Sequence, residues 1–427
     1  MERPLTERMR SDGRPVELRA YREAGGYEGL RRALSLSPKQ VQETVTASGL
    51  RGRGGAGFPT GQKWSFVPLG PAARRPKYLV VNADEMEPGT MKDRWLLEGD
   101  PHQLLEGIAI AAHAIEAEVA YIYLRGEYRA SAAALERAME EAREAGLLGD
   151  GASGFRLEVH LHLSAGRYMC GEESGLIDAL EGRRATPRNK PPYPQLSGLW
   201  GKPTVVNNVE TLCNLPHILA KGPEWFRSLS QSPDAGTTIY GASGHLKRPG
   251  LWELPMGATA REILEREAGG MQEGFRLRGF LPGGASTEFV LEEKLDTPMD
   301  FASVAKVGSR LGTGTMVVLD DKTCPVGMLA SLERFFARES CGFCTPCREG
   351  LPWVLRILLA LEEGTGTMQD VKVLEDHARF IRPGTTYCAL APGAMEPLAS
   401  GLQHFREDFE RHVREGGCPW RQAWRAS

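Results

Sequence analysis

Three cysteines lie within seven residues, Cys341-Gly-Phe-Cys344-Thr-Pro-Cys347, and this part of the chain must therefore form a loop that presents three thiols together. Spacers of two residues let successive sulfurs converge on one face of a metal cluster, and Cys388 can supply a fourth ligand. Four cysteines also satisfy a tetrahedral zinc ion, but zinc sites usually pair their ligands two and two. The three-plus-one spacing favours a [4Fe–4S] cluster over zinc.

The remaining cysteines, Cys170, Cys213, Cys324 and Cys418, have no partner nearby in the sequence. The N-terminus is charged and lacks the apolar segment of an export signal, so a reducing compartment is expected. In such a compartment metal ligation by the cysteine-rich loop is favoured over disulfide formation. The four other cysteines are predicted to be ungrouped thiols.

The composition is typical of a multidomain globular protein. A length of 427 residues suggests two to four domains. The net charge of −3 gives no electrostatic case for binding nucleic acid or an anionic membrane surface. The most apolar long stretch, 107–124, is interrupted by charged and polar side chains, whereas a membrane span needs roughly 20 apolar residues. Any membrane association is therefore expected to run through other subunits.

The order of predicted elements divides the chain into three parts. Residues 1–235 alternate between strands and helices, which predicts an α/β domain. Residues 236–325 contain short β-like pieces separated by turns, as in a small domain of ubiquitin-like size. Residues 326–427 carry apolar stripes at three- and four-residue spacing, which predict a helical bundle. In the first part we predict strands at 78–81, 119–124 and 157–163 and helices at 37–50, 101–116 and 130–145.

A glycine-rich segment follows the first of these helices. Its glycines, Gly52, Gly54, Gly55 and Gly57, resemble a dinucleotide-binding loop, but that loop normally follows a strand. Closely spaced glycines can still turn backbone N–H groups toward a phosphate or leave room for a flat ring. Lys63 could then pair with a phosphate or with a reduced, anionic isoalloxazine. A tight structural turn is an equally good interpretation of the loop alone.

A polar and acidic segment directly follows the predicted buried strand at 78–81. It contains Asn82, Asp84, Glu85 and Glu87. An isolated acidic cluster is more often solvated surface. Because α/β sheets bind ligands beyond the carboxyl ends of their strands, the position of this cluster favours a ligand site.

Several longer motifs extend over most of the chain. They are Arg51-Gly-Arg-Gly-Gly-Ala-Gly-Phe58, Asn82-Ala-Asp-Glu85, Gly166-Arg-Tyr-Met-Cys-Gly-Glu-Glu173, Arg188-Asn-Lys-Pro-Pro-Tyr193, Gly201-Lys-Pro-Thr204, Asn207-Asn-Val-Glu-Thr211 and Glu339-Ser-Cys-Gly-Phe-Cys-Thr-Pro-Cys-Arg348. Together they resemble the NADH-binding flavoprotein subunit of bacterial respiratory complex I. The resemblance departs from the usual family sequence at Tyr193, where Phe is usual, and at Ser174-Gly175, where Thr-Ala is usual.

The resemblance implies three cofactors, FMN, NAD(H) and a [4Fe–4S] cluster, and a set of site residues for each. The FMN site would comprise Gly52, Gly54, Lys63, Asn82, Asp84, Gly171, Glu172, Asn207, Asn208 and Thr211. NADH would stack on Phe58 and Phe66 and contact Glu87, Glu173 and Lys190. The motif residues expected to complete the cofactor-binding surface are Gly55, Gly57, Glu85, Tyr168 and Tyr193. The cluster ligands would be Cys341, Cys344, Cys347 and Cys388.

The implied activity is that of an NADH:quinone oxidoreductase subunit in a proton-translocating complex. NADH would give hydride to FMN, and single electrons would pass to the cluster and onward to partner subunits and quinone. No catalytic side chain is expected, because the cofactor supplies the redox chemistry. The fold implied is a Rossmann-like FMN and NADH domain, a β-grasp domain and a helical cluster domain.

The implied partners are a thioredoxin-like [2Fe–2S] subunit and a large iron–sulfur subunit, in the peripheral arm on the cytoplasmic side of the cell membrane. One alternative is a diaphorase subunit of an NAD-dependent hydrogenase or formate dehydrogenase. The lack of a further cysteine motif disfavours it. A second alternative is a non-enzymatic scaffold with a structural zinc ion.

Overall fold

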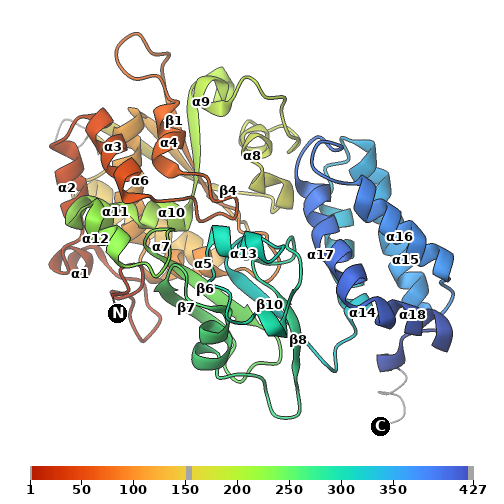
Figure 1. Ribbon diagram of the computed structural model, residues 1–427. Coiled ribbons are helices and arrows are strands. Elements are labelled where there is room, and N and C mark those ends of the chain that lie inside the picture. Colours follow the sequence, from red (N-terminus) through yellow and green to blue (C-terminus); the bar gives the residue numbers. More distant parts are fainter. Residues whose placement is uncertain (1, 151–155, 422–427) are drawn as a thin grey trace. The chain divides into compact units, whose positions relative to one another are not determined.

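The computed structural model describes residues 2–150 and 156–421, and the chain divides into two compact units. The first unit contains residues up to 86, 91–239 and 253–258. The second contains 87–90, 240–252 and the chain from 259 onward. Figure 1 follows the chain from the red and orange elements of the first unit to the blue helices of the second.

The first unit is built on a five-stranded sheet in the order β3-β4-β2-β1-β5. All neighbouring strands are parallel except β3, which is antiparallel to β4. Tyr78 pairs with Val119 on one side and Thr204 on the other, so β1, β2 and β5 end at one edge. The strands are β1 (Tyr78–Ala83), β2 (Val119–Leu124), β3 (Gly149–Asp150), β4 (Arg156–Leu163) and β5 (Thr204–Asn208). The predicted α/β fold is confirmed; β5 was not predicted.

Both faces of this sheet are covered by helices. Leu79, Val80 and Val81 of β1 have no exposed surface, as expected for a central parallel strand. Val80 clusters with Leu176 and Ile177 of α8, while α6 contacts β1 and β2. Since successive side chains of a strand point to opposite faces, these contacts place α8 and α6 on different sides.

The helices of the first unit begin and end as follows. They are α1 (Leu18–Glu23), α2 (Glu28–Leu34), α3 (Pro38–Ser48), α4 (Thr60–Ser65), α5 (Lys92–Gly99), α6 (Pro101–Ile115), α7 (Arg129–Glu144), α8 (Glu173–Leu180), α9 (Pro194–Ser197), α10 (Val209–Cys213), α11 (Leu215–Lys221) and α12 (Pro223–Ser228). The predicted helices match α3, α6 and α7. The start of α3 is fixed by a capping box, in which Ser37 accepts a hydrogen bond from the Gln40 N–H and the Gln40 side chain accepts one in return.

A second five-stranded sheet has the order β7-β6-β10-β8-β9. Its central strand β10 is parallel to β6 and antiparallel to β8. The strands are β6 (Thr237–Ser243), β7 (Gly250–Pro255), β8 (Leu277–Leu281), β9 (Val290–Leu291) and β10 (Thr315–Asp320), with helix α13 (Phe301–Lys306) before β10. A β-rich middle region is therefore present, and its assignment as a β-grasp domain stays a prediction.

The C-terminal part is helical, as predicted, and its helices lie together in the blue part of Figure 1. Leu351, Val354 and Leu358, from the predicted apolar stripe, have no exposed surface. The helices are α14 (Pro325–Glu339), α15 (Leu351–Glu363), α16 (Met368–Phe380), α17 (Leu390–His404) and α18 (Arg406–Glu415). Within the described part of the chain, no helix is both long enough and apolar enough to span a membrane.

Candidate functional site

The carboxyl ends of β1 and β5 lie side by side in the first unit and bring three predicted site residues together. Asn82 at the end of β1 pairs in register with Asn208 at the end of β5. The Asn82 amide donates a hydrogen bond to the Cys170 carbonyl at 3.1 Å, which fixes the turn containing Gly171 beside β1. Asn207 accepts a hydrogen bond from the Trp64 indole N–H at 2.9 Å. The predicted ligand edge of the sheet is thus formed by segments far apart in sequence.

The glycine-rich loop is held against the end of β5. It is closed by a hydrogen bond from the Gly52 N–H to the Phe58 carbonyl at 2.9 Å, and Gly57 has a φ of 65°, which favours glycine. A Cβ atom at Gly54 would lie 3.1 Å from the Asn208 Cβ, so the absence of a side chain permits this close approach. The Arg53 N–H donates to the Thr211 hydroxyl at 2.9 Å. The loop therefore forms a wall of the site.

Asp84, just beyond β1, has one buried oxygen that lacks a donor. Its Oδ1 accepts a hydrogen bond from the Ser164 hydroxyl at 2.9 Å. Its Oδ2 is buried without a hydrogen-bond partner among the described residues. Burial raises the pKa of Asp84 to about 6. Because an unsatisfied buried carboxylate oxygen is costly, this atom is suited to accept a hydrogen bond from a ligand O–H or N–H.

A buried charged cluster beside Asn208 was missed from the sequence. The ammonium of Lys92, a fully buried side chain, lies 2.8 Å from both Asp93 and Glu210. Burial alone would lower the pKa of Lys92, but these carboxylates raise it above its ordinary value. Asp93 accepts a hydrogen bond from the Asn208 amide at 2.6 Å, and its N–H donates to Glu85 at 2.9 Å. Glu85 therefore belongs to this buried group, which supports Asn208 at the end of β5.

Two predicted lysines and two predicted glutamates form ion pairs at the start of α8. Lys63 lies 2.7 Å from Glu173 and also donates to the Val206 carbonyl at 2.8 Å. Lys190 lies 2.7 Å from Glu172, which caps α8. Burial would raise the pKa of Glu173, but Lys63 and Lys190 lower it below its ordinary value. In this arrangement Lys63 is paired with a carboxylate of the chain.

Large aromatic side chains predicted to contact the nucleotide are exposed. Phe58 and Phe66 are 46% and 49% exposed, and their ring centroids are 6.4 Å apart. Tyr193 is 55% exposed. Exposed rings of this kind gain free energy when a flat base covers them. Tyr168 begins the short helical turn that ends at Gly171, and a Cβ atom at Gly171 would meet no atom within 4 Å.

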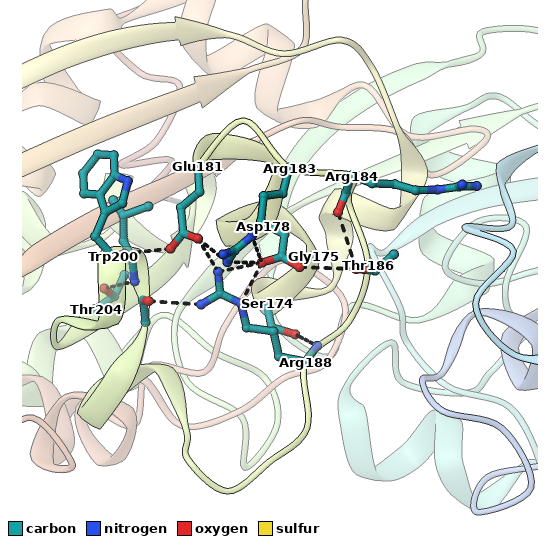
Figure 2. A network of polar contacts seen from close by, with 12 residues as sticks. Ser174, Gly175, Asp178, Glu181, Arg183, Arg184, Thr186, Arg188, Trp200 and Thr204 are labelled. Carbon is teal, nitrogen blue, oxygen red and sulfur yellow. Dashed lines mark hydrogen bonds and ion pairs between the residues drawn. The ribbon is translucent and has the colours of Figure 1, made fainter.

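The segment carrying Lys190 and Tyr193 is anchored to α8 by Arg188. The Arg188 guanidinium lies 2.6 Å from Asp178 and 2.8 Å from Glu181, and its backbone N–H donates to the Ser174 hydroxyl at 2.9 Å. Figure 2 shows these contacts converging on Arg188. Since guanidinium–carboxylate bonds are directional, this network fixes the segment that presents Lys190.

The four predicted cluster cysteines lie on neighbouring loops of the second unit. Cys341, Cys344 and Cys347 lead into the start of α15, and Cys388 precedes α17. The Phe343 and Tyr387 rings, one from each loop, have centroids 4.7 Å apart. Burial and, to a smaller extent, the other three thiols together raise the pKa of Cys347 to about 12. All eight cysteines fall within the described residues and form no disulfide, so these four can act as metal ligands.

The structure groups Glu87 and two of the cysteines differently from the sequence analysis. Glu87 belongs to the second compact unit, where its carboxylate accepts a hydrogen bond from the Ser286 N–H at 2.8 Å. Cys324 and Cys418, predicted to be ungrouped, lie with Glu362 and His412 in one cluster. Nothing in the local sequence reveals this cluster, because its members are brought together by helix packing.

Two family models match the regions that contain these sites. The Nuo51 FMN-binding domain matches residues 45–217, which include the glycine loop and the strand ends. The NADH-ubiquinone oxidoreductase-F iron-sulfur binding region matches residues 327–412, which include the four cysteines.

Similar proteins cover nearly the whole chain. The NADH-quinone oxidoreductase F subunits of Salmonella typhimurium and Escherichia coli are each 56% identical over 415 residues, covering 96% of this chain and 93% of the relative. The corresponding F subunit of Streptomyces coelicolor is 49% identical over 405 residues, covering 94% of this chain and 89% of the relative. A crystal structure of NAD+-reducing [NiFe]-hydrogenase is similar with a TM-score of 0.82 and 35% identity, covering 94% of this chain and 67% of that one.

Proposed function

The chain belongs to the family of NADH-quinone oxidoreductase F subunits, and we propose that its strand-edge site binds FMN and accepts electrons from NADH for transfer to a [4Fe–4S] cluster. The observation that carries this proposal is the buried Oδ2 of Asp84, which lacks a donor at the carboxyl edge of a parallel sheet. FMN, when bound, accepts hydride from NADH and releases electrons one at a time.

The residues at the strand edge fit FMN. Asp84 offers an acceptor for a ring or ribityl donor, and Asn82 and Asn207 fix the flanking segments. Gly54 lets the loop approach Asn208 without a clash, which leaves a flat wall for a ring. The buried cluster of Lys92, Asp93 and Glu210 keeps Asn208 in place, so the role of this cluster is to position Asn208. We propose that the other FMN contacts are those of the predicted set.

The dinucleotide is proposed to bind over the exposed aromatic rings and the paired charges. Phe58 and Phe66 offer stacking surfaces for adenine, and Lys190 offers a positive charge to the phosphate and ribose region. Glu172 and Glu173 neutralise the two lysines, so the dinucleotide meets a site of low net charge. These residues would orient NADH, and none would need to transfer a proton, because bound FMN would supply the redox chemistry.

The proposed ligands of the [4Fe–4S] cluster are Cys341, Cys344, Cys347 and Cys388. Thiolate ligands on two adjacent loops suit a cubane, whose iron atoms each take one cysteine. The contact between the Phe343 and Tyr387 rings joins the two loops.

The wider assembly follows from the family. The chain is a subunit of an NADH-quinone oxidoreductase, and we propose a thioredoxin-like [2Fe–2S] subunit and a large iron–sulfur subunit as its neighbours. We further propose a place in the peripheral arm on the cytoplasmic side of the membrane. Three functional domains are proposed, 1–235, 236–325 and 326–427. The parallel pairing of the first and last strands of the middle sheet supports a β-grasp assignment for the second.

A diaphorase subunit of an NAD-dependent hydrogenase is the second candidate, because the [NiFe]-hydrogenase structure shares this fold at 35% identity. The quinone oxidoreductase is favoured by the 56% identity to the Salmonella typhimurium relative and by the coverage of 93% of that relative.

Anaerobic purification followed by flavin, iron and NADH–ferricyanide assays tests the proposal. It predicts one FMN and about four iron atoms per chain, with NADH-dependent turnover. The proposal would be contradicted if the protein contained zinc without flavin and did not oxidise NADH after reconstitution with FMN. That result would support a non-enzymatic scaffold with a structural zinc ion.

A further inference from the structure

Four potential metal ligands, two from helices and two from the segments that flank helices, meet in the C-terminal bundle and do not include the proposed cluster cysteines. Cys324 precedes α14, Glu362 lies at the end of α15, His412 lies on α18 and Cys418 follows α18. Their ligand atoms all lie within 4.8 Å of one another. His412 and the Glu362 side chain are 0% and 3% exposed, Cys418 is buried and Cys324 is half-buried, so the cluster is largely shielded from solvent.

The separations between three of the ligand atoms are close to those of tetrahedral coordination. Cys324 Sγ lies 3.0 Å from Glu362 Oε1 and 3.3 Å from His412 Nε2, and the last two atoms are 3.1 Å apart. Around a zinc ion, with bonds of about 2.0–2.3 Å, ligand atoms are separated by about 3.3–3.8 Å. A shift of a few tenths of an ångström would bring these three atoms to such positions, and Cys418 Sγ lies within 4.8 Å of each of them.

The surroundings orient the ligand atoms toward one another. His412 Nδ1 lies 2.6 Å from the Asp408 carbonyl, and this hydrogen bond leaves the Nε2 lone pair facing the cluster. Arg421 lies 3.1 Å from Glu362 Oε2 and leaves Oε1 toward the sulfur of Cys324. The Gly327 N–H donates to Cys324 Sγ at 3.2 Å, an interaction that stabilises a thiolate. His412, Glu362 and Cys324 thus each have a polar partner outside the cluster, as metal ligands commonly do.

We propose that the chain binds one structural zinc ion through four ligands: Cys324, Glu362, His412 and Cys418. Two sulfur ligands exclude calcium and magnesium, which take oxygen ligands, and a tetrahedral set of S, N and O atoms suits zinc. Binding releases the two thiol protons to solvent. The two thiolates and the Glu362 carboxylate then carry three negative charges, which zinc and Arg421 together balance.

The site would fasten the segment that follows α18 to the bundle. Cys418 lies beyond the last residue of α18, whereas Cys324 and Glu362 belong to the segments of α14 and α15. The Trp420 ring stacks on His412 with centroids 6.0 Å apart, which covers the cluster from the side of the C-terminal segment. The ion is therefore assigned a stabilising role and takes no part in the redox steps.

Zinc analysis of the anaerobically purified full chain, by elemental analysis and zinc-edge X-ray absorption, tests this assignment. We expect about one zinc per chain that survives dialysis against a chelator, with two sulfur neighbours at about 2.3 Å and two nitrogen or oxygen neighbours at about 2.0–2.1 Å. Zinc surrounded by four sulfurs would mean occupation of the other cysteine site, and less than about one tenth of an equivalent would mean an empty cluster. Either result overturns the proposal.

Substitutions then identify the ligands. Cys418→Ser and His412→Gln are expected to remove most of the zinc while the iron content and NADH–ferricyanide activity remain. The matched control, Cys213→Ser, changes a buried cysteine of the first unit and should keep the zinc. Full zinc retention in both ligand variants contradicts the assignment. If a variant does not fold, the absorption spectrum of the unsubstituted protein still decides.

Discussion

Asn82 and Asn208 are neighbours in register at the carboxyl ends of two parallel strands, although 125 residues separate them in the chain. This pairing gives the glycine loop a fixed surface to lie against, and it places Asp84 at the same edge. The contact between the glycine-rich loop and Asn208 and the position of the buried Asp84 Oδ2 therefore both depend on the register of β1 and β5. The open space at Gly171 lies beside the same strand ends.

Substitution of Gly54 by alanine should weaken FMN binding. The new Cβ would lie 3.1 Å from the Asn208 Cβ, and Asn208 is held by Asp93 and by the N–H of Thr211. The loop must then move away, and we expect at least a tenfold rise in the FMN dissociation constant, or about 1.4 kcal/mol. Flavin fluorescence titration of the flavin-free protein measures it. Gly250→Ala, whose Cβ would meet only ordinary contacts, is the control.

Asp84→Asn should stabilise the flavin-free protein at neutral pH. Burial raises the folded pKa of Asp84 from 3.8 to about 6, so the folded state binds the extra proton between these values. Stability from this group therefore falls as pH rises from about 4 to 6, and the full penalty is present above pH 6. Replacing the Asp84 carboxylate should increase the free energy of unfolding by at most about 3 kcal/mol at pH 7.5 and by less than about 1 kcal/mol near pH 4.

Urea unfolding at the two pH values measures this difference. Asp296→Asn removes an exposed carboxylate whose pKa is lowered by Arg261, and it should bring no gain at pH 7.5. An equal gain for Asp84→Asn at pH 4 and pH 7.5 would show that its charge is not the cause.

Lys190→Gln should raise the KM for NADH more than it lowers kcat. The substitution removes a positive charge and leaves Glu172 and Glu173 with one lysine fewer. Because the Lys190 side chain is partly exposed, we expect about a fivefold to tenfold rise in KM and a change in kcat of less than about twofold. Steady-state NADH–ferricyanide kinetics provide the measurement. Lys202→Gln is a matched control, since the Lys202 ammonium donates to the Arg75 carbonyl and not to Glu172 or Glu173. An equal rise in KM in this variant would contradict the assignment.

Cys388→Ser should separate flavin reduction from cluster reduction. A serine in place of one thiolate leaves the proposed cubane with three cysteine ligands. We expect NADH to bleach the flavin at an unchanged rate, while iron content and the cluster signal in electron paramagnetic resonance fall. Cys213→Ser should leave both unchanged. A normal cluster in Cys388→Ser would assign the fourth ligand elsewhere.

The sequence was sufficient to locate elements whose signals are local. Strand β1 follows from four consecutive apolar residues, and helix α3 follows from its capping residues and periodic valines. The position of Asn82 at the carboxyl end of β1 then indicated the ligand edge, because α/β folds generally bind ligands beyond the carboxyl ends of their strands.

Features that depend on long-range packing were not predictable in this way. Strand β5 has five residues, Thr-Val-Val-Asn-Asn, too few to show a period. A lysine next to an aspartate ordinarily indicates surface, yet Lys92 is fully buried because Glu210 lies opposite it. Cys324 and Cys418 meet only after the helices pack, so their spacing in sequence carried no signal.

Rapid mixing of the anaerobic protein with NADH tests the central claim most directly. Flavin absorbance and freeze-quenched electron paramagnetic resonance are followed in the same sample. The account predicts that the flavin is bleached first and that the cluster signal appears afterwards, with the amplitudes of both steps reduced in Gly54→Ala protein of lower FMN content. A flavin-loaded protein whose absorbance does not change with NADH, or a cluster that stays oxidised after flavin reduction, would contradict it.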